Sequence, residues 1–177
     1  MTGRIEKLEP FDSKTRRLNA IIETPIGSRV KYSYDPETGL FALTKVLPAG
    51  MAFPYNFGFI PQTKAEDGDP LDVLMLNEQP LFPGCFVKVR LIGVVKAEQT
   101  KHARWVRNDR LVGEALGKEL PLESKPLKLD KHTVSQIEFF FSSYNSLFGQ
   151  RFRVIGIGGP QKALELTRQA CVPSNGE

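Results

Sequence analysis

The sequence predicts a mainly β fold with some α structure, in which a small closed barrel of short strands precedes two C-terminal helices. Three observations predict it. Apolar segments of strand length alternate with Gly/Pro turns across the first two thirds of the chain. Apolar residues then recur at helical spacing between Asp130 and Leu147. Gly159-Pro160 is a typical opening for a last helix, because proline suits the first helical turn.

The strand-like segments follow one another at close spacing. Tyr32 and Tyr34 alternate with Lys31 and Ser33, which is the period of a half-buried strand. Turns rich in Gly and Pro are expected at residues 24–28, 35–39 and 79–84. The expected strands are residues 18–23, 29–34, 40–46, 57–61, 71–76 and 85–95.

The last third is expected to be helical, with one more strand at residues 151–157. Asp130 is a candidate N-cap and Gly149 a candidate end of the first helix. Its apolar stripe comprises Val134, Ile137, Phe140, Phe141 and Tyr144. Residues 173–177 are polar and terminal, so we expect them to fray.

Composition indicates one domain over residues 1–177. Apolar residues make up 41% and charged residues 25%, which is ordinary for a globular protein. No apolar run approaches the roughly 18 residues of a membrane span, and the N-terminus lacks the hydrophobic stretch of a secretory signal. A cytoplasmic location is therefore expected, with Cys85 and Cys171 as free thiols.

The net charge of +4 permits an anionic ligand. The basic residues are scattered, however, and no stacking platform of interleaved aromatic and basic residues stands out. Neither nucleic acid nor a membrane is therefore expected as a partner.

The segment 66–72 holds four carboxylates in seven residues, around Gly68 and Pro70. Like charges so close together resist burial, and carboxylate oxygens are the usual protein ligands of hard divalent cations. The alternative is an acidic surface turn. The calcium-loop pattern does not fit, because Pro70 follows the second acid. The carboxylates of Asp67, Asp69 and Asp72 can converge only on an irregular turn.

Glu23 and Lys31 flank the 24–28 turn and are candidate neighbours in a hairpin. Without further context they could equally form an exposed cross-strand ion pair, which contributes under about 1 kcal/mol.

Together with residues 53–63, Phe-Pro-Tyr-Asn-Phe-Gly-Phe-Ile-Pro-Gln-Thr, the acidic segment resembles the motifs of the soluble (family I) inorganic pyrophosphatases. Glu23, Lys31, Pro83-Gly84 and Ser143-Tyr144 fall in the order and spacing of that family. The resemblance covers about residues 18–157, and 158–177 would form a C-terminal helix and tail. It implies a five-stranded OB-like closed barrel flanked by two C-terminal helices.

The resemblance also implies Mg²⁺-dependent hydrolysis of pyrophosphate to two phosphates. Asp67 and Asp72 would be metal ligands, and Glu23 would act through metal-bound water. Asp69 would be the general base and Lys31 would bind phosphate. A homo-oligomer is implied as well, and the short chain favours a hexamer.

Several positions depart from the family pattern. Ser33 stands where the family has an acid, and Lys45 matches a family arginine. Lysine keeps the charge but loses the bidentate fork. Phe53 and Phe57 replace tyrosines. Tyr144 is retained as a candidate catalytic and substrate-binding residue, whereas the lysine that follows it in the family is absent here.

The second acidic motif of the family is the largest departure. Asn108 stands at the position of one of its metal-binding acids. We expect Glu98 and Asp109 to supply the missing carboxylates and Arg110 to contact phosphate as a catalytic residue. Asp109 can do so only if the backbone is irregular there, because neighbouring residues on a strand face opposite sides.

Two functions are therefore the main candidates: an active pyrophosphatase, and a related protein that binds metal, phosphate or a partner without catalysis. A nucleic-acid-binding barrel is the weakest third hypothesis, because no stacking platform stands out. A related phospho-anhydride substrate is a variant of the first.

Overall fold

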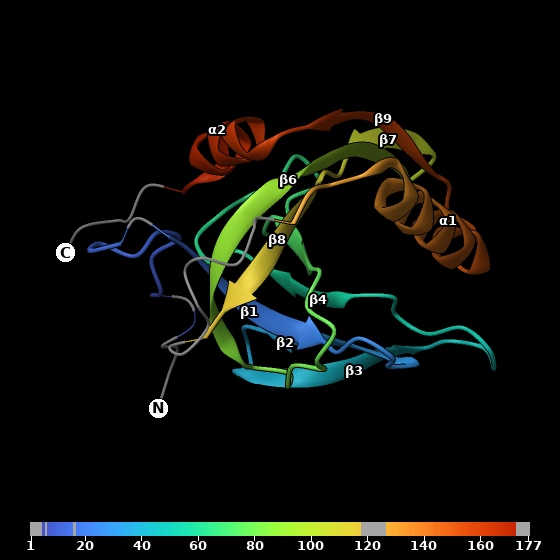
Figure 1. Ribbon diagram of the computed structural model, residues 1–177. Helices are drawn as coiled ribbons and strands as arrows, with labels where there is room; N and C mark the ends of the chain where they lie inside the picture. Colours follow the sequence, from blue (N-terminus) through green and yellow to red (C-terminus); the bar gives the residue numbers. More distant parts are fainter. Residues whose placement is uncertain (1–4, 6, 16, 118–126, 173–177) are drawn as a thin grey trace.

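The computed structural model describes residue 5 and residues 7–15, 17–117 and 127–172 (Figure 1), so the tail expected to fray lies outside them. The first strands are β1 (Leu18–Thr24), β2 (Val30–Asp35), β3 (Leu40–Val46), β4 (Asn56–Phe59) and β5 (Asp72–Met75). They are followed by β6 (Phe86–Lys101), β7 (Arg104–Arg107), β8 (Arg110–Leu116), α1 (Lys131–Leu147), β9 (Phe152–Gly158) and α2 (Pro160–Ala170).

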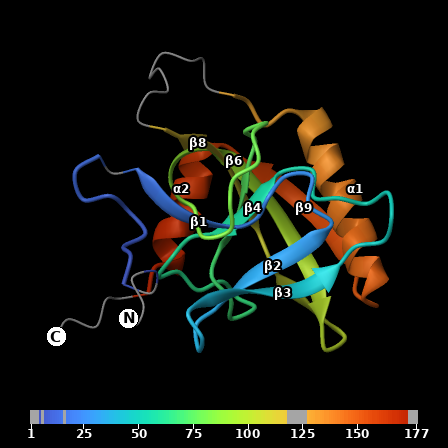
Figure 2. The same ribbon diagram turned by 90° about the horizontal axis from the view of Figure 1, so that it is seen from below.

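Five strands pair into a closed ring in the order β1-β4-β5-β8-β6, with β6 returning to β1. All neighbours are antiparallel except β5 and β8, which run parallel. The long strand β6 bends along the ring and also pairs with β7 and β9 (Figures 1 and 2). The predicted class, mainly β with a closed five-stranded arrangement and two C-terminal helices, is confirmed.

The strands between residues 96 and 116 were not expected from the sequence. There β6 continues to Lys101, a tight turn follows at His102 and Ala103, and β7 returns beside it. Parts of both strands face solvent and carry charged residues. The alternation of apolar and polar residues that marks a half-buried strand is therefore interrupted there.

Two apolar clusters lie on opposite faces of β5 and β8, because successive side chains of a strand alternate. Leu74 and Val112 pack in the cluster that includes the predicted stripe of α1. Val73 and Leu111 pack in the other, with Ala163 of α2. The same alternation turns the polar ends of the two strands, Asp72 and Arg110, toward the α1 face.

The strands β2 and β3 form a separate two-stranded sheet. Thr24 at the end of β1 ties it to the ring, because its hydroxyl donates to the Tyr32 carbonyl and accepts from the Tyr32 N–H, both at 3.1 Å. Lys31 and Lys45 are direct partners in this hairpin, so two ammonium groups are brought to one place.

Among the described residues, no helix has both the length and the apolar character that a bilayer crossing requires.

Candidate functional site

A cavity of about 130 Å³ lies between the acidic turn, the β2–β3 hairpin and α1. It brings acids and bases from distant parts of the chain to one place. Its charged lining residues are Asp67, Asp69, Asp72, Lys31, Lys45 and Arg110. A larger cavity of about 580 Å³ adjoins it, with Lys31, Asp69 and Asp72 in both linings and Glu23 in the larger one.

The acidic turn is held in an irregular shape by its own backbone. Gly68 adopts a φ of +95°, which a side chain would strain. The Ala65 N–H donates to the Asp69 carbonyl at 2.7 Å, and the Asp69 N–H donates to the Asp67 carboxylate at 3.2 Å. Thr63 anchors the far end, since its hydroxyl accepts from the Leu71 N–H at 3.0 Å. The carboxylates can therefore converge as an extended strand would not allow.

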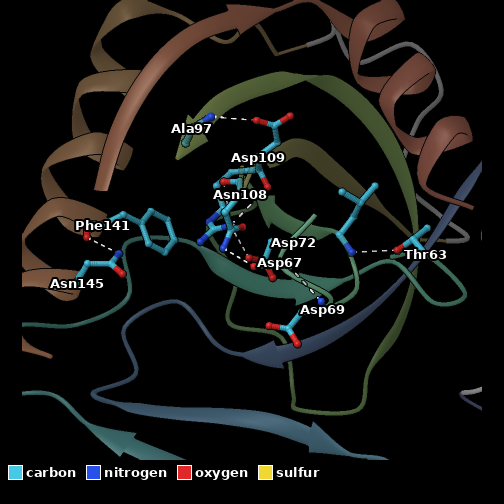
Figure 3. A network of polar contacts seen from close by, with 11 residues as sticks. Thr63, Asp67, Asp69, Asp72, Ala97, Asn108, Asp109, Phe141 and Asn145 are labelled. Carbon is cyan, nitrogen blue, oxygen red and sulfur yellow. Dashed lines mark hydrogen bonds and ion pairs between the residues drawn. The ribbon is translucent and has the colours of Figure 1, made fainter. Parts of the chain in front are cut away.

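Asp67 and Asp72 are joined through Asn108, which lies between β7 and β8, and Arg110, the first residue of β8. The Asn108 amide donates to the Asp67 carboxylate at 2.8 Å, and its oxygen accepts from Arg110. Arg110 pairs with Asp72 at 2.5 Å. Figure 3 shows Asp67, Asp69 and Asp72 close together beside Asn108. Burial raises the pKa of Asp72, against the opposing charges of Arg110 and Lys31, and burial also raises the pKa of Asp67.

Glu23 is the next-to-last residue of β1 and is buried in the lining of the larger cavity. The Tyr34 N–H donates to its carboxylate at 2.7 Å. Burial raises the pKa of Glu23 to about 7, and the nearby charges of Asp72 and Asp69 add to the rise. A cation among these carboxylates would relieve their repulsion.

The opposite wall is cationic and aromatic. The ammonium of Lys31 lies 5.5 Å from the ring centroid of Phe57, and that of Lys45 lies 3.8 Å from that of Phe148. Burial, with the neighbouring charge of Lys31, lowers the pKa of Lys45. Burial raises the pKa of Tyr144 to about 12, so its hydroxyl stays protonated at neutral pH. That hydroxyl has no hydrogen-bond partner among the described residues, so it is available to a bound anion.

The structure does not bring Glu98 or Asp109 to this cavity. Glu98 lies on β6 and pairs with Arg153 of β9 at 2.6 Å. The Asp109 carboxylate accepts from the Ala97 N–H at 3.0 Å (Figure 3). It also accepts from Arg107 at 2.6 Å. Asp109 lines a different cavity, beside α2. Asn108 and Arg110 contact the acids, whereas the side chain of Asp109 between them contacts Ala97 and Arg107 instead.

Four uncharged polar residues of the cavity were not among the sequence candidates: Gln99, Asn108, Asn145 and Gln150. The position of Asn108 in the family motif was the one available signal. Asn145 is satisfied within α1, because its amide donates to the Phe141 carbonyl at 2.8 Å.

The carboxylates suit a hard divalent cation in part. Glu23, Asp69 and Asp72 offer oxygen ligands, and the pKa of Glu23 is raised mainly by burial, with the charges of Asp72 and Asp69 adding to it. Among the described residues, however, no three acidic, histidine or cysteine side chains are close enough to hold one ion. On the other side of the turn, an N–H of Asn108 contacts the Asp67 carboxylate and an N–H of Arg110 contacts the Asp72 carboxylate. One oxygen of each carboxylate is therefore already in contact with the protein.

The chain is similar to known proteins over most of its length. A sequence model of a family described as inorganic pyrophosphatase matches residues 20–173. An inorganic pyrophosphatase of Nanoarchaeum equitans is 37% identical over 85% of this chain and 93% of its own. One from Geobacillus stearothermophilus is 34% identical over 88% and 92%. A crystal structure of inorganic pyrophosphatase from Thermus thermophilus superposes with a TM-score of 0.81 at 34% identity, covering 95% of this chain and 97% of that one.

Proposed function

The chain belongs to the inorganic pyrophosphatase family, and from this premise we propose that it hydrolyses pyrophosphate to two phosphates in the cavity between the acidic turn and the β2–β3 hairpin. One observation carries the assignment to this place. Asp67, Asp69 and Asp72 line a single cavity together with Lys31, Lys45 and Arg110. Pyrophosphate is a small polyanion, which needs both cationic side chains and cation-holding carboxylates.

The chain's own residues divide the work as follows. Lys31 and Lys45 hold the phosphoryl oxygens from the hairpin, and the Tyr144 hydroxyl donates to one of them. Asp69 is exposed at the mouth of both cavities and accepts the proton of the attacking water. Asp67 is held by Asn108 and by the Asp69 N–H, so the turn presents Asp69 in a fixed position.

The cofactor we propose is Mg²⁺, with Glu23, Asp67 and Asp72 as the ligand candidates. When bound, such an ion lowers the pKa of a coordinated water and neutralises phosphate charge. Glu98 and Asp109 are left out of the ligand set, because both are paired elsewhere.

Phosphate release from pyrophosphate by the purified protein tests the proposal, with Mg²⁺ and with chelator. We expect turnover with Mg²⁺ that chelator abolishes and that Asp69→Asn reduces by about 10²-fold or more, the usual contribution of a general base. No turnover above background with Mg²⁺ or Mn²⁺ would favour the alternative, a relative that binds metal or phosphate without catalysis.

We further propose a cytoplasmic homo-oligomer, with a hexamer as the favoured state. Cys85 and Cys171 are both free, as expected in a reducing compartment. Phe139 on α1 and Ile155 and Ile157 on β9 are exposed apolar residues that an assembly would cover. Light scattering coupled to gel filtration measures the oligomeric state directly, and a monomer at micromolar concentration would contradict the assembly.

A further inference from the structure

The guanidinium of Arg110 is buried where β5 and β8 begin, beside the carboxylate of Asp72. Arg110 opens β8 and is the direct partner of Asp72 in the parallel pairing of β5 and β8. It is 4% exposed, an extreme value for arginine. Its guanidinium carbon lies 4.8 Å from the ring centroid of Phe141 and 5.9 Å from that of Phe152. The side chain is thus fixed by packing as well as by charge.

One nitrogen of this guanidinium is surrounded by oxygen atoms. Nη1 lies 2.5 Å from Asp72 Oδ2, 3.3 Å from the Asn108 carbonyl oxygen and 3.4 Å from the Asp109 carbonyl oxygen. It also donates to the side-chain oxygen of Asn108. A carboxylate, an amide oxygen and two backbone carbonyls are the donors that hard cations take in proteins. We call these four oxygen atoms the Arg110 cage.

Asn108 completes the arrangement from the other side. Its amide group points its oxygen at Arg110 and its N–H at Asp67, at 2.8 Å from Oδ2. An acid at this position would instead set a third carboxylate beside Asp67 and Asp72. The two residues therefore act together. Compared with an acid at position 108, Asn108 leaves the cage with one negative charge fewer, and Arg110 adds a positive charge.

We propose that Arg110 is a built-in cation, which fills a position in the acidic site that a divalent ion would otherwise occupy. The inference rests on the proposed function only in treating the acidic turn as a cation site. The protein then needs fewer bound divalent ions, and the ions it takes lie on the side of the larger cavity, which Glu23, Asp69 and Asp72 line. Arg110 stays in the cage, and Lys31 and Lys45 carry the contacts to phosphate.

Mn²⁺ binding without any phosphate tests this, measured by isothermal titration calorimetry on the full chain. In Arg110→Gln the cage is vacated, and we expect at least a tenfold lower Mn²⁺ dissociation constant or one more ion per chain. The matched control is Lys45→Gln, which removes the same charge from the same cavity and leaves the cage intact. Its effect is expected to stay below threefold. Equal effects of the two variants would overturn the proposal.

Loss of a buried charge partner can prevent folding, so a second variant carries the test independently. Asn108→Asp adds a carboxylate to the cage while Arg110 still fills it, so we expect Mn²⁺ affinity to rise less than threefold. Gln161→Glu makes the same charge change on the exposed face of α2 and is expected to alter affinity less than twofold. A gain of tenfold or more in Asn108→Asp alone would show that the cage takes a divalent ion with Arg110 present, and would overturn the proposal. Because no pyrophosphate is present, this result is independent of whether the protein turns over pyrophosphate.

Discussion

Asn56 provides the sharpest stability prediction, because one fully buried side chain holds two loops beside the site. It opens β4 and is 0% exposed. Its side-chain oxygen accepts from the N–H groups of Ile26 at 3.1 Å and Leu81 at 2.9 Å. Its amide donates to the carbonyls of Asn77 at 3.3 Å and Gln79 at 2.9 Å. The 24–28 turn and the 77–81 loop are thereby fixed to each other.

The substitution Asn56→Ala leaves these four backbone groups without their partner. A buried polar group without a partner costs about 1–3 kcal/mol. The partner residues Ile26, Asn77 and Leu81 are half-buried and Gln79 is exposed, so water restores part of this loss. We expect a total cost of about 2–4 kcal/mol, a large part of the roughly 5–15 kcal/mol that stabilises a typical domain. Equilibrium urea denaturation followed by circular dichroism measures the free energy of unfolding.

Asn77→Ala is the matched control for this prediction. The Asn77 side chain is partly exposed and makes two hydrogen bonds, both to the backbone of Ala115, against the four made by Asn56. We expect a cost of about 1–2 kcal/mol. If Asn56→Ala lowers the free energy of unfolding no more than Asn77→Ala does, the reasoning from the four hydrogen bonds of the buried Asn56 side chain is refuted.

Three further predictions concern the ring and the site. In chelator, Glu23→Gln should gain stability relative to wild type as pH rises from 4.5 to about 7, because the folded carboxyl keeps its proton over that range and the unfolded one does not. The gain reaches about 3 kcal/mol, and a pH-independent difference between the two urea midpoints would contradict it. Gly58→Ala places a Cβ 2.2 Å from the Ile21 carbonyl oxygen, where β1 and β4 approach closely. It should cost about 1–3 kcal/mol in urea denaturation, and an unchanged midpoint would show that the strands can separate freely. Mg²⁺ at 100 times its dissociation constant should stabilise wild type by about 2.7 kcal/mol and Asp72→Asn much less, as seen in thermal melts; an equal rise would place the ion elsewhere.

The acidic turn could be predicted because its chemistry is local in sequence. Asp67, Asp69 and Asp72 lie within six residues, around a glycine that permits the turn. Lys31 and Lys45 were indicated by the family resemblance, and the β2–β3 hairpin sets them opposite each other. The apolar stripe of α1 was recognisable for the same reason, because its period is local.

The other half of the site depends on contacts between distant strands. Glu98 is paired by Arg153 of β9, and nothing near Glu98 in the sequence indicates that partner. The Asp109 carboxylate contacts the Ala97 N–H of β6 and Arg107 instead of the acids, and the contact with β6 comes from strand pairing. The burial of Arg110 follows from the parallel pairing of β5 and β8, which sets it against Asp72. Strand pairing of this kind is a property of the whole fold and could not be read from a motif.

The most direct test compares the rate of Mg²⁺-dependent phosphate release from pyrophosphate in Asp69→Asn and Glu66→Gln. Both variants remove one negative charge from the same turn, but Asp69 lines the catalytic cavity and Glu66 lines the one beside α2. The proposed site predicts a loss of about 10²-fold or more in Asp69→Asn and near-wild-type turnover in Glu66→Gln. Equal rates in the two variants, or no turnover in wild type, would contradict it.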